Sequence, residues 1–376
     1  MTTATRNARP WILLNPGPVN VTDRVRLALL KPDICHREEE FSVLLKSVRQ
    51  KLLKIFKVQN THTVAVFSGS GTTALEAMLS SFAMRHQAIL VLSNGVYGDR
   101  MKTILEIHGT PVRVLSSKAG DFPGLGKIET LLKNDASIHA VAMVHHETST
   151  GMLNPLREVG RLAKKYKKTF IVDAISSLGA EKIDFNKDSI DVLSGTSGKC
   201  LHGLPGASFV ILSKKTAQNL KRQRPKTLSL DLLSTLEAEE KDGTPFTPAV
   251  QIFYAFNEAL EELLQEGLNH RIEDYAKKNA LLENGFMRLN FVFLVEKKYR
   301  SHVLTALWLP PALPYAKLHD ALKKEGFVIY AGQSELKGRI FRVSNLGDIK
   351  PSDLERFLSA LRKVLKRLGS QVQSPR

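Results

Sequence analysis

Two stretches of the chain combine small residues with groups suited to binding and catalysis. Ser68 to Met78 have the sequence SGSGTTALEAM, in which glycines and small hydroxyl residues open a helical pattern. A helix start of this kind directs backbone N–H groups and the positive end of the helix dipole toward an anion. The stretch lacks the Gly-Lys-Ser/Thr ending of a nucleotide P-loop and the glycine spacing of a dinucleotide fingerprint. It therefore indicates either a phosphate site or a tight turn without a ligand.

The second stretch contains a lysine in an unusual setting, and two further residues have comparable positions. Lys199 lies in SGTSGKC, between two strand-like runs rather than on a solvated helix face. Asp173 ends the apolar run TFIVD, where a buried carboxylate needs a lysine, a helix N-terminus or a protonated ring nitrogen as its partner. Tyr97 stands between Gly95 and Gly98 and is either a core residue or a stacking platform.

Together these groups match the requirements of pyridoxal 5′-phosphate. This cofactor needs an anion site, a stacking surface, a counter-charge for its pyridinium nitrogen and an amine that binds it covalently. The four groups occur in this order, each after a successive strand-like run. Ligands of doubly wound sheets bind at the carboxyl ends of the strands, so we expect one cofactor site there.

The elements that must position this site alternate along the chain. Apolar runs typical of buried strands begin at Thr63, Ala88, Val141, Thr169, Asp191 and Ala207, with helical patterns among them. This alternation predicts an α/β fold with a mostly parallel sheet covered by helices on both faces. A long helix is expected from Val250 to about Glu266, and a mixed region after it predicts a smaller α+β domain.

Composition and charge limit the class of protein. The chain has 376 residues, 43% of them hydrophobic, and no apolar stretch approaches the roughly 20 residues that span a bilayer. Its two cysteines, Cys35 and Cys200, cannot form a disulfide framework, so we expect a soluble protein of the reducing cytoplasm. The formal net charge is +17, but the lysine clusters lie on helical patterns without zinc spacing or an RNA-binding consensus. We therefore expect anionic small molecules as ligands, no nucleic acid, no membrane and no metal.

The chain resembles the class V, fold type I aminotransferases. The resemblance rests on LLNPGPVNVTDRVRLAL, GSGTTALEA, SNGVYG, AMVHHETSTGMLNP, IVDAISSLG and FRVSNLG, and it extends over nearly the whole sequence. It implies a seven-stranded, mostly parallel sheet in an α/β/α sandwich, a smaller α+β domain and a homodimer. The expected division is an N-terminal segment near the active site (1–18), a large cofactor-binding domain (19–255) and a small domain (256–376).

The resemblance also implies roles for individual residues that hold the cofactor. Lys199 would bind pyridoxal 5′-phosphate covalently and act as the base, and Asp173 would pair with the pyridine nitrogen. Tyr97 would stack on the ring. The phosphate would be held by Ser70, Gly71 and Thr72.

Three more residues and one departure complete the implied site. Thr148 would approach the phenolic oxygen of the ring, and Thr247 would reach the cofactor of a neighbouring subunit. Arg342 would bind the substrate carboxylate. Where relatives often have Asn or Gln before the lysine, this chain has Gly198, so a side-chain contact to the phosphate is expected to be missing.

The motifs VHHETSTGMLNP and SLDL are closest to one subgroup of the family. That subgroup moves the amino group of 2-aminoethylphosphonate to pyruvate, which gives phosphonoacetaldehyde and alanine in phosphonate catabolism. Alanine–glyoxylate and serine–pyruvate transamination remain alternatives, because they use the same cofactor residues. A cysteine desulfurase would need a mobile catalytic cysteine, which neither Cys35 nor Cys200 fits. A basic binding protein with an inactive site is disfavoured because Lys199 and Asp173 are both present.

Overall fold

A computed structural model of the protein describes residues 11–220 and 224–369. Its centre is a seven-stranded sheet with the strand order β2-β10-β9-β8-β5-β3-β4. Only β10 runs against its neighbours, so the sheet is mixed but mostly parallel, as predicted. The strands are β2 (His62–Gly69), β3 (Ala88–Ser93), β4 (Val112–Ser116), β5 (Ile138–Val144), β8 (Thr169–Asp173), β9 (Val192–Thr196) and β10 (Gly206–Ser213).

The edge strand β4 was not expected from the sequence. Its residues, VRVLS, are half-buried or exposed along their whole length, so they lack the continuous apolar run of the central strands. The other strands are buried on both faces, which is the reason their sequences are strongly apolar.

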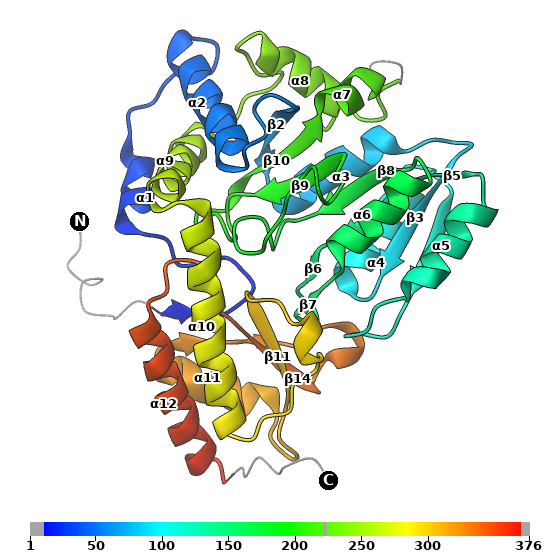
Figure 1. The fold of residues 1–376 in the computed structure, drawn as a ribbon. Coiled ribbons are helices and arrows are strands. Elements are labelled where there is room, and N and C mark those ends of the chain that lie inside the picture. Colours follow the sequence, from blue (N-terminus) through cyan, green and yellow to red (C-terminus); the bar gives the residue numbers. More distant parts are fainter. Residues whose placement is uncertain (1–10, 221–223, 370–376) are drawn as a thin grey trace.

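Helices cover both faces of the sheet (Figure 1). Successive residues of β2 alternate between two cores: Val64 and Val66 belong to one, and Ala65 and Phe67 to the other. The first core includes α2 (Glu39–Ile55), α5 (Leu125–Asn134), α6 (Leu156–Lys165) and α9 (Val250–Glu266). The second includes α3 (Gly71–Phe82), α4 (Val96–Ile107), α7 (Lys214–Leu220) and α8 (Leu232–Glu240).

A smaller α+β unit follows with its own core. It contains the antiparallel sheet β11-β14-β13 and three long helices that pack together on it (Figure 1). Its elements are α10 (Leu268–Arg288), η3 (Lys297–Tyr299), β11 (Leu304–Trp308), α11 (Tyr315–Lys324), β12 (Phe327–Val328), β13 (Tyr330–Ala331), η4 (Ser334–Leu336), β14 (Ile340–Ser344) and α12 (Pro351–Arg367).

The two cores separate after α9. The expected boundary between residues 255 and 256 falls inside this helix, whose Phe256, Leu260 and Leu263 pack in the core of the large sheet. The next helix, α10, places Leu282 and Phe286 in the small core. The helix predicted from Val250 to about Glu266 is α9 itself.

The N-terminal segment joins the two units. Strand β1 (Ile12–Leu13) pairs in parallel with β12 of the small unit. The chain then crosses to the large unit and continues into α1 (Asp23–Leu27) and η2 (Ala28–Leu30), which lie against α9 (Figure 1). Residues 1–10 of the predicted N-terminal segment lie outside the described residues.

The described residues contain no helix that is both long and apolar enough to cross a membrane. Within residues 11–220 and 224–369, no cluster of three or more His, Cys, Asp or Glu side chains is arranged to hold a metal ion. Cys35 is exposed and Cys200 is buried, and both thiols are free.

Candidate active site

A cavity of about 270 Å³ lies where the loops after β2, β3, β8 and β9 meet. Most of the residues that the sequence predicted line this cavity. They are Ser70, Gly71, Thr72, Tyr97, Asp173 and Lys199. The prediction that these side chains converge is therefore consistent with the geometry, and the reason is that parallel strands bring their carboxyl ends to one edge of the sheet.

The element suited to an anion is the start of α3. Ser70 is the N-cap residue in an extended conformation, but its side chain forms no capping hydrogen bond. The first amides of a helix, here those of Gly71 and Thr72, have no acceptor within the helix. No acidic residue lies in the first turn of α3. These amides and the helix dipole are thus available to an anionic group.

Lys199 lies in the loop between β9 and β10 and is mostly buried. Its Nζ donates a hydrogen bond to the carbonyl oxygen of Pro16. Gly17 has a φ of +113°, and a Cβ there would come within 2.5 Å of Nζ, so glycine allows the lysine to reach this position. Burial lowers the pKa of Lys199 to about 8. A larger share of the amine is therefore neutral at physiological pH than for an exposed lysine.

Asp173 ends β8 and is 3% exposed. Its Oδ1 accepts a hydrogen bond of 2.9 Å from the amide of Ile175. Burial raises the pKa of this carboxyl to about 6, although the Ile175 amide and the charges of Arg100 and Lys199 act in the opposite direction. The carboxylate is thus ionised at neutral pH without an ion-pair partner among the described residues, and a cationic ligand would relieve that cost.

Tyr97 is held in place by a buried carboxylate that sequence reasoning did not identify. Glu147 is completely buried, and its Oε2 accepts hydrogen bonds from the amides of Tyr97, at 3.1 Å, and Gly98, at 3.2 Å. Its other oxygen accepts hydrogen bonds from Ser149. Burial raises the pKa of Glu147. Because these amides belong to the first turn of α4, the carboxylate fixes the helix that carries Tyr97.

The cavity residues that were not predicted include two with ionisable side chains, Arg100 and His146. Arg100 lies three residues after Tyr97 on α4, a spacing that places both side chains on one helix face and could have revealed it. The Nδ1–H of His146 donates to the carbonyl of Ser176 at 2.8 Å, and its Nε2 accepts from the Ser301 hydroxyl of the small unit at 2.8 Å. Burial lowers the pKa of His146 to about 4, so the ring is neutral.

Arg342 and Thr148 meet each other beside the cavity but do not line it. Arg342 is fully buried, and its Nη1 donates to the backbone carbonyl of Thr148 at 2.7 Å. Its Nε and Nη2 donate to the carbonyl of Ala331 at 2.9 and 2.7 Å, and Nη1 also contacts Oε1 of Gln333 at 3.2 Å. Burial lowers the pKa of Arg342. Most donors of this guanidinium therefore have protein partners.

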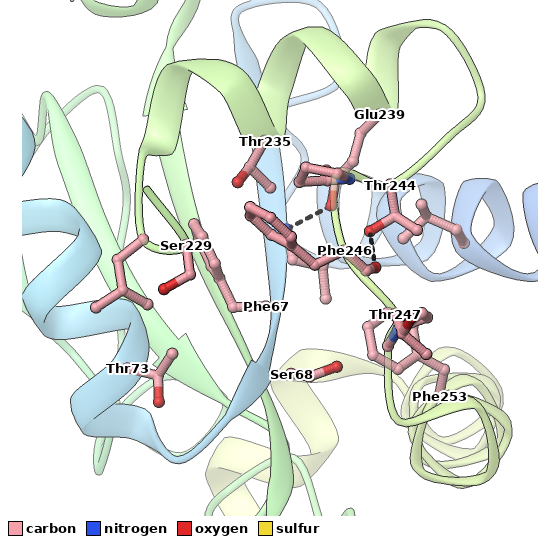
Figure 2. A pocket seen from close by; sticks show the side chains of 15 residues that line it. Phe67, Ser68, Thr73, Ser229, Thr235, Glu239, Thr244, Phe246, Thr247 and Phe253 are labelled. Carbon is pink, nitrogen blue, oxygen red and sulfur yellow. Dashed lines mark hydrogen bonds between the residues drawn. The ribbon is translucent and has the colours of Figure 1, made fainter. Parts of the chain in front are cut away.

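Thr247 does not line the cavity but a separate pocket of about 190 Å³ (Figure 2). It is exposed and belongs to the segment between α8 and α9, opposite Ser68 and Thr73 of the β2–α3 region. Glu239 closes the pocket. Its Oε1 accepts from the amide of Val66 at 2.9 Å, and burial raises its pKa to about 8 in spite of Arg49 nearby. Thr247 thus does not contribute to the cavity of its own chain.

Comparison with known proteins agrees with this fold. The model of the family described as aminotransferase class-V matches residues 28–342. The 2-aminoethylphosphonate--pyruvate transaminase of Vibrio cholerae is 34% identical over 361 residues, which cover 94% of this chain and 98% of that enzyme. The enzyme of the same name from Bacillus mycoides is 34% identical over 362 residues, covering 95% and 98%.

A solved structure shows the same architecture. The alanine–glyoxylate aminotransferase from Nostoc sp. superposes with a TM-score of 0.90 at 26% identity, covering 97% of this chain and 98% of that one. The family match and these relatives extend over most of the sequence. The chain belongs to the class-V aminotransferase family.

Proposed function

We propose that this protein is a pyridoxal 5′-phosphate-dependent enzyme that transfers the amino group of 2-aminoethylphosphonate to pyruvate. The products are phosphonoacetaldehyde and alanine. The observation that carries the proposal is the meeting of Lys199, Asp173 and the start of α3 in one cavity, in a chain whose 34% identical relatives are named for this reaction.

The residues present fit this cofactor. The amides at the start of α3 suit its phosphate, and Asp173 is a buried carboxylate that needs a cation such as a pyridinium. Tyr97 lines the same cavity and offers a ring for stacking. Lys199 is the only lysine that lines the cavity, within the described residues, and it would form the covalent bond. When bound, the cofactor supplies an electron-withdrawing ring that stabilises a carbanion.

Lys199 performs the proton transfers in this scheme. Its lowered pKa of about 8 makes the neutral amine accessible, and Nζ can take a proton from the carbon that bears the amino group of the donor. In the second half-reaction Nζ would return a proton to the carbon that becomes the α-carbon of alanine. Asp173 keeps a proton on the ring nitrogen, because its carboxylate is a favourable partner only for the charged form. An arginine in place of Lys199 could not act as a base, since it stays protonated.

Arg342 is the proposed anchor for the acidic group of each substrate. It would receive the carboxylate of pyruvate in one half-reaction and the phosphonate of the donor in the other, through charge-assisted hydrogen bonds. The Gln333 contact is the longest of its hydrogen bonds, 3.2 Å, and belongs to a side chain that can rotate away. If the Gln333 side chain rotated away, one N–H of Arg342 Nη1 would be free to bind the substrate. The Thr148 hydroxyl is proposed to approach the phenolic oxygen of the cofactor.

The active protein is proposed to be a cytoplasmic homodimer. Thr247 is exposed and does not line the cavity of its own chain, so it is free to reach the cofactor of a second subunit. Large apolar side chains at Leu27, Leu30 and Phe246 are 61%, 79% and 42% exposed, and a subunit interface would cover them. Two free thiols are typical of a reducing compartment.

Competing donors test the proposed substrate. Initial rates of alanine formation from pyruvate are measured with 2-aminoethylphosphonate and with serine, and rates of glycine formation are measured with alanine and glyoxylate. We expect 2-aminoethylphosphonate with pyruvate to give the highest kcat/KM. Similarity to the Nostoc alanine–glyoxylate enzyme supports the main alternative. If alanine with glyoxylate is far the faster pair, the phosphonate assignment is wrong while the fold and Lys199 are unaffected.

A further inference from the structure

Arg100 is a cationic side chain in the cavity that no step of the reaction described above uses. It extends from α4, lines the same cavity as Ser70 and Lys199, and lies over the ring of Tyr97 at 4.7 Å from the ring centroid. Its Nη1 donates to Oγ1 of Thr72 at 3.2 Å. The guanidinium therefore lies next to the first turn of α3, at the end of the cavity suited to an anion.

The hydrogen-bonding capacity of Arg100 is mostly unused. Among the described residues, Thr72 is its one hydrogen-bond partner, and the guanidinium forms no ion pair with a carboxylate. A guanidinium has five N–H donors in a planar fork that suits the oxygens of a phosphate or phosphonate. Arg342 differs in this respect, because carbonyl groups and Gln333 already accept from most of its donors.

The charge at this end of the cavity also favours a role for Arg100. A phosphate monoester has about 1.5 to 2 negative charges at neutral pH. A helix N-terminus is equivalent to about half a positive charge, which leaves most of the phosphate charge without compensation. Arg100 is a cation that contacts the first turn of α3 directly, through its hydrogen bond to Thr72. One arginine together with the helix would come close to balancing the phosphate.

Gly198 leaves the loop that carries Lys199 without a side-chain contact to the phosphate. This position lines the cavity directly before Lys199 but has no side chain to offer. A Cβ at Gly198 would lie 3.0 Å from both the Cα and the backbone nitrogen of Pro205. The loop that carries Lys199 is therefore packed on the glycine, and a larger residue would require the loop to shift. Glycine itself offers no side chain that could contact the phosphate from this position.

We propose that Arg100 binds the phosphate group of the cofactor and supplies from α4 the side-chain contact that Gly198 cannot make. The proposal rests on the proposed function, because it assumes that a phosphorylated cofactor occupies the cavity. Arg100 thus increases the affinity of the protein for the phosphate. Because it also lies over the ring of Tyr97, it connects the phosphate site with the stacking surface.

The test compares a phosphorylated and an unphosphorylated ligand. Protein freed of cofactor is titrated with pyridoxal 5′-phosphate and with pyridoxal, and binding is followed by quenching of protein fluorescence. In Arg100→Met we expect the Kd for pyridoxal 5′-phosphate to rise by roughly 10- to 100-fold, the loss typical of a charge-assisted hydrogen bond. The Kd for pyridoxal should stay within about twofold. Arg100→Lys should recover part of the affinity, since it keeps the charge.

Lys102→Met is the matched control. Lys102 lies on the same helix, does not line the cavity and is 44% exposed in its side chain, so its removal should leave both affinities unchanged. Thermal unfolding of each variant confirms that it is folded before titration. An equal loss of affinity for both ligands in Arg100→Met would overturn the proposal, because it would show that Arg100 acts only through the ring of Tyr97.

The donor phosphonate is the other possible source of an anion. If Arg100→Met keeps its affinity for pyridoxal 5′-phosphate but shows a raised KM for 2-aminoethylphosphonate when saturated with cofactor, the arginine binds the donor and the proposal is wrong. Failure of the wild-type protein to bind pyridoxal 5′-phosphate at all would refute the proposed function itself. A wrong role for Arg100 and a wrong proposed function can therefore be told apart, since only a wrong proposed function abolishes cofactor binding by the wild-type protein.

Discussion

Replacement of Asp173 by asparagine should make the cofactor-free protein more stable and the enzyme much less active. Asp173 is 3% exposed, and its pKa rises from 3.8 to about 6 chiefly because it is buried. An acid with a higher pKa in the folded state holds its proton more tightly there. Its contribution to stability is complete below about pH 4 and is lost as the pH rises through about 6.

The size of the effect follows from this shift. About two pKa units correspond to roughly 3 kcal/mol at neutral pH, at 1.36 kcal/mol per unit. Asparagine resembles the neutral acid in shape and can still accept the hydrogen bond from Ile175. We therefore expect Asp173→Asn to raise the free energy of unfolding by up to about 3 kcal/mol at pH 7.5 and by only about 1 kcal/mol at pH 4.5.

Urea unfolding of the cofactor-free protein at both pH values measures this difference. Asp184→Asn is a control that should change stability in the opposite direction, because backbone hydrogen bonding by Lys187 lowers the pKa of Asp184. The loss of its charge should reduce stability at pH 7.5. Turnover of Asp173→Asn should fall steeply, since the charge that retains the ring proton is gone. Equal stability of variant and wild type at pH 7.5, or unchanged turnover, would refute the role assigned to this carboxylate.

Four further outcomes follow from the same site. Lys199→Ala should leave no cofactor fixed to the chain by borohydride, as checked by mass spectrometry; a fixed cofactor would identify a different lysine. In the wild type the rate of covalent cofactor capture should rise with pH through about 8, because Nζ must lose its proton, and a midpoint near 10.5 would contradict the burial effect. Mixing Lys199→Ala with Thr247→Trp should restore activity in hybrid dimers, and its absence despite proven subunit exchange would count against a shared site. Arg342→Lys should raise KM for both pyruvate and 2-aminoethylphosphonate, whereas normal KM values would exclude it as the anchor.

The positions of Lys199, Asp173, Tyr97 and the start of α3 were predictable because each lies at or just after the carboxyl end of a largely buried strand. Buried strands can be recognised from short segments of sequence, and the carboxyl ends of parallel strands lie at one edge of the sheet. These two rules together place the residues in one site. The edge strand β4 was not predicted, because its half-buried and exposed residues form no continuous apolar run.

Contacts between distant segments could not be predicted in this way. The carbonyl of Pro16 meets Lys199 only because β1 pairs with the small unit and the chain then crosses the cavity. His146 is fixed by Ser301, more than 150 residues later in the chain. Arg342 was expected to bind substrate, yet its contacts to Ala331 and Thr148 are visible only once the small unit is folded against the large one.

Transfer of labelled nitrogen tests the central claim most directly. Purified protein loaded with pyridoxal 5′-phosphate is incubated with ¹⁵N-labelled 2-aminoethylphosphonate and pyruvate, and the products are followed by NMR. We predict that ¹⁵N appears in alanine, that phosphonoacetaldehyde forms in equal amount, and that Lys199→Ala gives neither product. If neither ¹⁵N-alanine nor phosphonoacetaldehyde forms, in protein that does convert alanine and glyoxylate, the assignment of the donor is contradicted.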